Sequence, residues 1–201
     1  MPCAQVVRLG LDKFADVYGD KTQDFSTYGQ KQAFSYYVDC KRPANDRLAA
    51  ALSPAARKQV NDVRESLQAI GNAAWANAYT TAGGGTIYAL ASVGAYAVRE
   101  DFMTSLIAAM RNPKAQPAAR RRAKAALQKA RRLLPSQSDV PTLEHWEPGD
   151  REAQQKLFKE NVIEMTNAFA NIERIVPMLP DRAAELLARR AADELDAGVE
   201  E

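Results

Sequence analysis

Seven apolar side chains in the last third of the chain recur at alternating intervals of four and three residues. They are Phe158, Val162, Met165, Phe169, Ile172, Val176 and Leu179. This spacing is a heptad seam, which places all seven on one face of a helix that packs lengthwise against near-parallel neighbours. Their burial contributes roughly 10–20 kcal/mol before the loss of chain entropy is subtracted. The seam predicts a long helix over residues 151–176.

The same three-to-four-residue periodicity, with its flanking Gly and Pro residues, predicts six further helices. They cover residues 4–18, 29–42, 54–71, 86–111, 117–134 and 181–197. Gly19, Pro43 and Gly71 are the expected stops, because glycine and proline commonly follow the last helical turn. Residues 46–52 are expected to add a turn of helix, and residues 72–81 a short helix or an irregular segment.

The chain shows no sustained alternation of apolar and polar residues, so no sheet is expected. Short connections between amphipathic helices indicate an all-α fold, a mostly antiparallel helical bundle of about six to seven helices. The 201 residues are expected to form one domain. Within it we distinguish aromatic-rich N-terminal helices (1–45), central helices (46–134) and a C-terminal helical pair (150–198).

Charge is unevenly distributed, although the net charge is only +2. Residues 111–138 hold nine basic and no acidic side chains, and residues 139–201 hold seven basic and 15 acidic ones. On a helical wheel, the segment 117–134 buries a narrow alanine-rich stripe and exposes a broad cationic face. That face consists of Arg120, Arg121, Arg122, Lys124, Lys129, Arg131 and Arg132.

Three interpretations of this basic helix compete. It is a solvated face partly neutralised by the acidic C-terminal third, a binding surface for an anionic partner, or a membrane-surface helix. An acidic protein or a nucleic acid would suit arginine, whose guanidinium engages two oxygens at once. The face lacks the aromatic residues that stack on bases, and the stripe lacks the Trp and Phe of interfacial helices.

No charged residue occurs in the stretch 66–98. Such a gap indicates burial, but the apolar content is too mild for a membrane-spanning helix, and no transmembrane span is expected. We expect the central helix of the bundle here, with a conditional membrane-inserting hairpin and self-association as alternatives. The run 83–85 is Gly-Gly-Gly without the Lys-Ser/Thr of a phosphate loop, which argues against a nucleotide site.

Cys3 and Cys40 are the only cysteines. They either form one disulfide in an exported protein or remain free thiols in a reducing cytosol. The default localisation is cytoplasmic, and it is periplasmic or secreted if a leader was removed. A cysteine followed by Ala4 and Gln5 is also compatible with a trimmed, lipid-anchored precursor.

Catalytic signals are weak. His145, the only histidine, lies in a loop with Glu144, Glu147 and Asp150, but this spacing matches no metal-ligand pattern. Other candidates are the carboxylates Glu160 and Glu164, one helical turn apart, and an aromatic patch of Tyr28, Tyr36 and Tyr37. The simpler interpretation is that the two carboxylates face solvent and that the tyrosines pack in or near the core. We therefore assign no catalytic residue, no metal ligand and no cofactor.

The sequence resembles no family that we can name. The best interpretation is a non-enzymatic interaction or structural module of bacterial type, with the basic helix 117–134 as its contact surface. One alternative is an exported, envelope-associated helical protein with a disulfide between Cys3 and Cys40. A further alternative is an enzyme or ligand-binding bundle without a recognisable motif.

Overall fold

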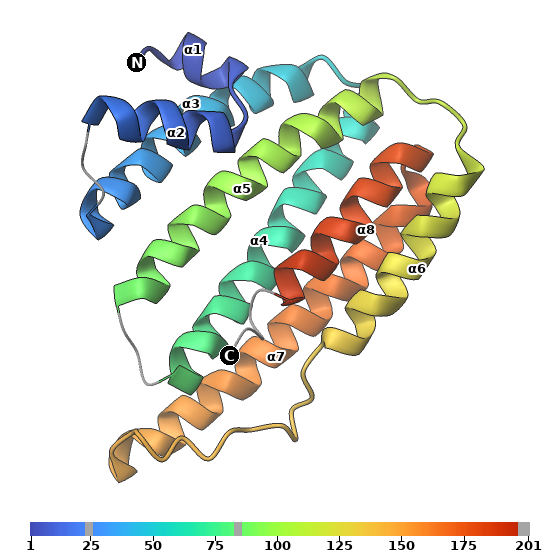
Figure 1. The fold of residues 1–201 in the computed structure, drawn as a ribbon. Coiled ribbons are helices and arrows are strands. Elements are labelled where there is room, and N and C mark those ends of the chain that lie inside the picture. Colours follow the sequence, from blue (N-terminus) through green and yellow to red (C-terminus); the bar gives the residue numbers. More distant parts are fainter. Residues whose placement is uncertain (23–25, 83–85, 197–201) are drawn as a thin grey trace.

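The computed structural model describes residues 1–22, 26–82 and 86–196, and it is built from helices that lie side by side (Figure 1). The described residues contain eight α-helices, one 3-10 turn and no strand, so the predicted all-α bundle is confirmed. In chain order the elements are α1 (Cys3–Arg8), α2 (Leu11–Thr22), α3 (Thr27–Ala50), α4 (Pro54–Ala82), α5 (Thr86–Arg111), α6 (Pro117–Leu133), α7 (Pro148–Ile175), the 3-10 turn η1 (Val176–Met178) and α8 (Asp181–Asp196).

Helix α4 lies in the middle of the bundle and packs against α3, α5, α7 and α8. From α3 to α8, each helix runs roughly antiparallel to the one that follows it (Figure 1). Helices α6 and α8, which are separated by α7 in the chain, begin at the same end of the molecule and run in the same direction (Figure 1). The ion pairs between them advance along both helices together, from Arg120–Asp181 to Lys129–Asp196.

The heptad seam forms part of the main core. All seven of its side chains are buried, and the most exposed of them, Phe158, is only 7% exposed. Helix α7 ends at Ile175, and the seam continues into η1, where Pro177 has no N–H to extend the α-helical ladder. The prediction of a continuous helix in this region is therefore confirmed.

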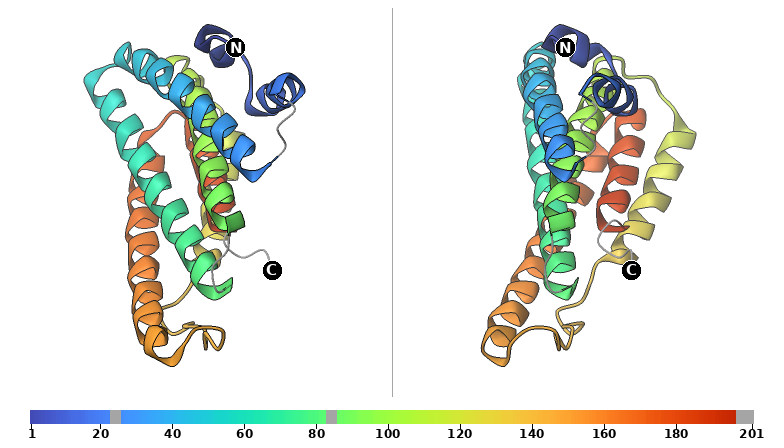
Figure 2. Two further views of the ribbon diagram at one scale, coloured as in Figure 1. Left: turned by 90° about the vertical axis from the view of Figure 1, so that its left-hand side faces the viewer. Right: turned by 60° about the vertical axis from the view of Figure 1, so that its left-hand side comes forward.

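A second, smaller core lies at the N-terminal end, where α1 and α2 pack against α3 and α5 (Figure 2). Its buried members are Val6, Phe14, Tyr37, Cys40 and Ala97. The predicted helix 4–18 is wrong in two respects. Its chain is split, because Leu9 adopts an extended conformation that ends α1, and α2 continues past Gly19 to Thr22.

The predicted stops at Pro43 and Gly71 are also wrong, since α3 and α4 run through both positions. Proline inside a helix costs about 3 kcal/mol. Beyond Pro43, however, Asn45 and Ala49 are buried, so tertiary contacts outweigh this local preference. Gly71 is followed by two further buried turns, and residues 72–81 are regular helix.

The charge-free stretch 66–98 is divided between α4 and α5. Its α4 part contributes Leu67, Ile70, Ala73 and Ala74 to the main core, which agrees with a central helix. No helix in the described part of the chain is long and apolar enough to cross a membrane. The glycine run 83–85 and residue 197, the expected end of the last helix, lie outside the described residues.

Candidate cationic interface

The basic helix predicted from the sequence is α6, and its local sequence explains how it sits on the bundle. Pro117 occupies the first helical position, where its missing N–H has no helical partner to lose. The buried face is formed by Ala119, Ala123 and Ala130. It packs mainly against α8, whose buried face is also rich in alanine. Small side chains on both sides bring the two helix axes close together.

Arg120 anchors the beginning of α6. Its guanidinium lies 2.5 Å from the Asp181 carboxylate and also donates to the carbonyl oxygens of Val176 and Leu179. Asp181 accepts a further bond of 2.6 Å from the backbone N–H of Gln116. The Gln116 N–H, followed by Arg120, lowers the pKa of Asp181. Arg120 therefore connects α6 to the start of α8 and to the turn before it.

Glu185 is the most heavily paired carboxylate of the interface. It is 1% exposed and contacts three guanidinium groups. Arg122 on α6 bonds to both of its oxygens, at 2.5 and 2.9 Å. Arg182 and Arg189 on α8 approach to 3.0 and 2.8 Å. The hydrogen bonds from Arg122 are the main reason that the pKa of Glu185 falls to about 2.

Two more cations of α6 form ion pairs nearer its C-terminal end. Lys129 lies 3.1 Å from Asp196 of α8, and Arg131 lies 2.7 Å from Glu173 of α7. Lys129 and Arg131 are mostly exposed, so each pair contributes about 0–1 kcal/mol. These two pairs therefore add little to the stability of the contact between α6 and its neighbours.

The remaining cations form what we call the α6 ridge: Arg121, Lys124 and Arg132. All three are exposed, and none forms an ion pair with the residues that the structure describes. At 100° per residue they lie on the side of α6 opposite the buried alanines. The ridge extends about 16 Å along the helix axis from its first to its last member.

The structure thus divides the seven predicted cations into two groups. Four of them, Arg120, Arg122, Lys129 and Arg131, are paired with carboxylates of the same chain. The three ridge residues face solvent. These carboxylates come from α7 and α8. The acidic third of the chain therefore neutralises part of the basic face, as the first of the three interpretations expects, but it leaves the ridge uncovered.

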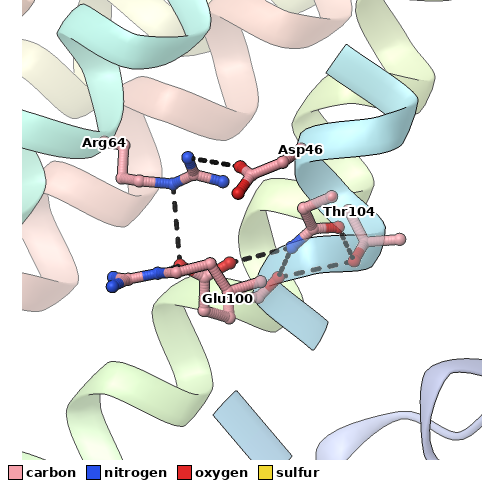
Figure 3. Close-up of polar contacts among 6 residues, drawn as sticks. Asp46, Arg64, Glu100 and Thr104 are labelled. Atoms are coloured by element: carbon pink, nitrogen blue, oxygen red, sulfur yellow. Dashed lines mark hydrogen bonds and ion pairs between the residues drawn. The ribbon is translucent and has the colours of Figure 1, made fainter. Parts of the chain in front are cut away.

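A second polar cluster, inside the bundle, has no signal in the sequence (Figure 3). Glu100 of α5 is 2% exposed and accepts hydrogen bonds from Arg42 at 3.0 Å and from Asn45 at 3.0 Å. Arg64 of α4 donates to Asp46 at 2.8 Å and lies 3.6 Å from Glu100. Because these residues come from three helices, the cluster joins α3, α4 and α5.

Cys3 and Cys40 form a disulfide that ties α1 to α3. Beside it, the hydroxyl group of Tyr37 donates to Asp101 at 2.5 Å, and Lys41 lies 3.1 Å from the same carboxylate. Burial, followed by the Asp101 bond, raises the pKa of Tyr37. The predicted aromatic patch is divided. Tyr36 and Tyr37 belong to the small N-terminal core, whereas Tyr28 is 68% exposed and accepts a hydrogen bond from Gln32.

The loop around His145 packs against the last turn of α4. The carbonyl oxygen of Thr80 accepts a hydrogen bond of 2.8 Å from Trp146 and lies 3.2 Å from Nε2 of His145. The last carbonyls of a helix have no partner within it, so these two side chains cap α4. In the described part of the chain, Glu144, Glu147 and Asp150 do not join His145 in a group of three or more possible metal ligands.

The structure brings a third carboxylate to the predicted pair Glu160 and Glu164. Glu65 of α4 lines the same open groove between α4 and α7, together with the exposed side chain of Ile163. The groove lies between α4 and α7, away from the cationic residues of α6 and α8. The three carboxylates are therefore no part of the cationic interface.

Comparisons of the chain with protein-family models, curated proteins and solved structures found no match.

Proposed function

We propose that the protein is a non-enzymatic helical interaction module that binds an acidic protein surface along the α6 ridge. The proposal rests on one observation. Arg121, Lys124 and Arg132 are exposed and unpaired among the described residues, while the other four cations of α6 are held by the protein's own carboxylates. The ridge therefore contributes little to holding α6 in place and is available to a partner.

The surroundings of the ridge favour an acidic protein over a nucleic acid. Binding to a nucleic-acid backbone usually involves many phosphate contacts, about 6–10 in strongly salt-dependent complexes. The ridge supplies three cations, fewer than such a backbone interface uses. Helix α6 also carries no aromatic residue on which a base would stack.

The arrangement of α6 also speaks against a membrane surface as the partner. Its apolar stripe is already packed on α8, through Ala119, Ala123 and Ala130. None of the exposed large hydrophobic side chains in the described part of the chain belongs to α6. An interfacial helix needs such side chains to bury in the acyl region.

The test is binding to poly-L-glutamate and to a short DNA duplex, measured by fluorescence anisotropy at several salt concentrations. The ridge variant R121E/K124E/R132E is expected to bind poly-L-glutamate at least about tenfold more weakly than the wild type. The wild type should prefer poly-L-glutamate to DNA. Circular dichroism should show unchanged helical content, because the three residues hold no other element in place.

The matched control is K31E/R47E/K159E, which makes the same change in net charge. Lys31, Arg47 and Lys159 are also exposed and form no ion pair with the described residues, but they lie on α3 and α7. This variant should keep most of the affinity. Equal losses in both variants would mean that net charge, and not the ridge, governs binding. If the wild type binds DNA more tightly than poly-L-glutamate, the partner of the ridge is a nucleic acid and not an acidic protein.

A second candidate function has its own supporting observation, the disulfide between Cys3 and Cys40. Structural disulfides persist in oxidising compartments, so this bond favours an exported helical protein. Mass measurement after thiol alkylation, on protein taken from its native compartment, tests this candidate. Two alkylated cysteines would rule it out, and none would support it.

A further inference from the structure

The arginines around Glu185 carry more positive charge than their shared partner can neutralise. Arg122, Arg182 and Arg189 all lie within 3.0 Å of the Glu185 carboxylate. None of the three forms an ion pair with any other carboxylate in the described ranges of the chain. We call these three residues the arginine triad. Around a single negative charge, it holds an excess of two positive charges.

The triad faces solvent, although the carboxylate beneath it does not. The three side chains are 47%, 48% and 56% exposed, whereas the side chain of Glu185 is 1% exposed. Each guanidinium has five N–H donors. Arg122 turns two of its nitrogens to Glu185, and Arg182 and Arg189 turn one each. The carboxylate therefore fixes the guanidinium groups in place, and their other N–H donors have no carboxylate partner among the described residues.

The start of α8 adds to the positive potential at Arg182, the one member of the triad that lies in a first helical turn. Helices α6 and α8 begin at the same end of the molecule (Figure 1), and both N-termini carry the positive end of a helix dipole. Arg182 is the second residue of α8, a position where a cation is unfavourable and an anion is favoured. Asp181, the first residue of α8, bonds to the Gln116 N–H at the start of α6 and pairs with Arg120, so it offsets part of this field and leaves the triad itself without a second anion.

We infer that the arginine triad is a binding site for a phosphate group in its dianionic form. Two negative charges match the excess of two positive charges, and phosphate oxygens suit the planar donor pairs of arginine. The site is distinct from the α6 ridge, because Arg122 lies on the flank of α6 next to α8 and the ridge points away from α8. The inference therefore does not depend on the proposed function.

Titration with inorganic phosphate tests this site, with sodium chloride at matched ionic strength as the reference. Binding is followed through the Nε–Hε NMR signals of the arginines and through the melting temperature. In the wild type, the signals of Arg122, Arg182 and Arg189 should shift together and saturate. The variant R182Q/R189Q retains the Arg122–Glu185 pair, and its affinity for phosphate should fall by about tenfold or more.

The matched control is R121Q/K124Q, which removes two positive charges from the ridge and leaves the triad complete. It should retain phosphate affinity within about twofold, although it lowers the net charge by the same amount as R182Q/R189Q. Because R182Q/R189Q could lose stability, R182K/R189K serves as a second variant. It preserves charge and removes the planar donor pairs, so an intermediate affinity is expected.

Two further titrations distinguish the sources of a phosphate group. O-phosphoserine represents a phosphorylated protein, and vesicles with phosphatidic acid, compared with pure phosphatidylcholine vesicles, represent a lipid headgroup. Loss of either interaction in R182Q/R189Q, but not in R121Q/K124Q, supports the site and identifies the source. If phosphate shifts no triad signal beyond the chloride reference, or if R182Q/R189Q binds phosphate as the wild type does, the inference is wrong. Poly-L-glutamate binding to the ridge would be unaffected by that result.

Discussion

Gly71 of α4 lies directly against the guanidinium group of Arg99 of α5, so closely that a methyl group at position 71 would overlap it. Arg99 is 5% exposed and forms an ion pair of 2.7 Å with Glu194 of α8. The missing side chain therefore allows three helices to meet around one buried pair of charges. Arg99 also lies over the ring of Tyr96, 4.9 Å from its centre.

The first prediction concerns Gly71→Ala. Alanine normally stabilises a helix interior by about 1 kcal/mol relative to glycine. Here the added methyl group must displace Arg99 or Glu194, and such overpacking costs about 1–3 kcal/mol. We expect a net decrease in the free energy of unfolding, measured by urea denaturation. The control is Gly149→Ala in the first turn of α7, where an added Cβ meets no atom within 4 Å. A stabilised Gly71→Ala protein would contradict the close contact.

The second prediction concerns the charge of Glu194. This carboxylate accepts hydrogen bonds from Arg99 and Arg190 and is 2% exposed. Removing one partner of a buried ion pair typically costs about 3–5 kcal/mol. Glu194→Gln should therefore unfold at much lower urea concentration. The double variant R99M/E194Q removes both charges of the Arg99–Glu194 pair and should recover part of this loss, although Arg190 also loses its ion pair. Additive effects in this cycle would show that the two residues are not coupled.

The third prediction is a pH dependence of stability. The pKa of Glu185 is lowered to about 2 in the folded protein from its ordinary value of 4.5. The unfolded chain therefore binds this proton more readily, and acidification favours unfolding. The stabilisation is complete above pH 4.5, is lost as the pH falls towards about 2, and is on the order of 2–3 kcal/mol.

Urea denaturation across this pH range checks the prediction. The comparison is Glu185→Gln, which cannot titrate at position 185 but retains the other carboxylates. The difference in unfolding free energy between the two proteins should shrink as the pH falls through that window. A constant difference at every pH would show that the carboxyl is not stabilised by the three arginines.

The fourth prediction concerns the disulfide. It closes a loop with a sequence separation of 37 residues, which lowers the entropy of the unfolded chain by the equivalent of about 3–4 kcal/mol. In C3S/C40S, hydrogen exchange should increase most in α1 and α2, because these helices belong to the small N-terminal core. Exchange in α7, which belongs to the main core, should change least. Uniformly faster exchange would mean that the two cores unfold together.

The sequence predicts the helices well where local and tertiary preferences agree. The expected bounds of residues 86–111 and 117–134 match α5 and α6 within one residue, since Pro113, Pro117 and Pro135 flank them. At Pro43 and Gly71 the local signals indicate an end, but burial of the following turns prevails. These contacts join residues far apart in the chain, so no local pattern reveals them.

The sequence predicts the candidate interface only in part. The wheel identifies all seven cations of α6, but it cannot show that α8 lies alongside with Asp181 and Glu185 in reach of Arg120 and Arg122. The arginine triad escapes sequence reasoning for the same reason. One of its members comes from a helix 60 or more residues from the other two, and only the parallel packing of α6 and α8 brings them together.

The separation of paired and unpaired cations on α6 also determines which of its positions tolerate substitution. Arg120 and Arg122 hold the helix on the bundle, whereas the ridge residues are exposed and form no ion pair within the described part of the chain. Substitutions at positions 121, 124 and 132 can therefore accumulate with little penalty for folding. New side chains at these three sites can change which partners the surface suits, whereas substitution of Arg120 or Arg122 also disturbs the seat of α6 on α8.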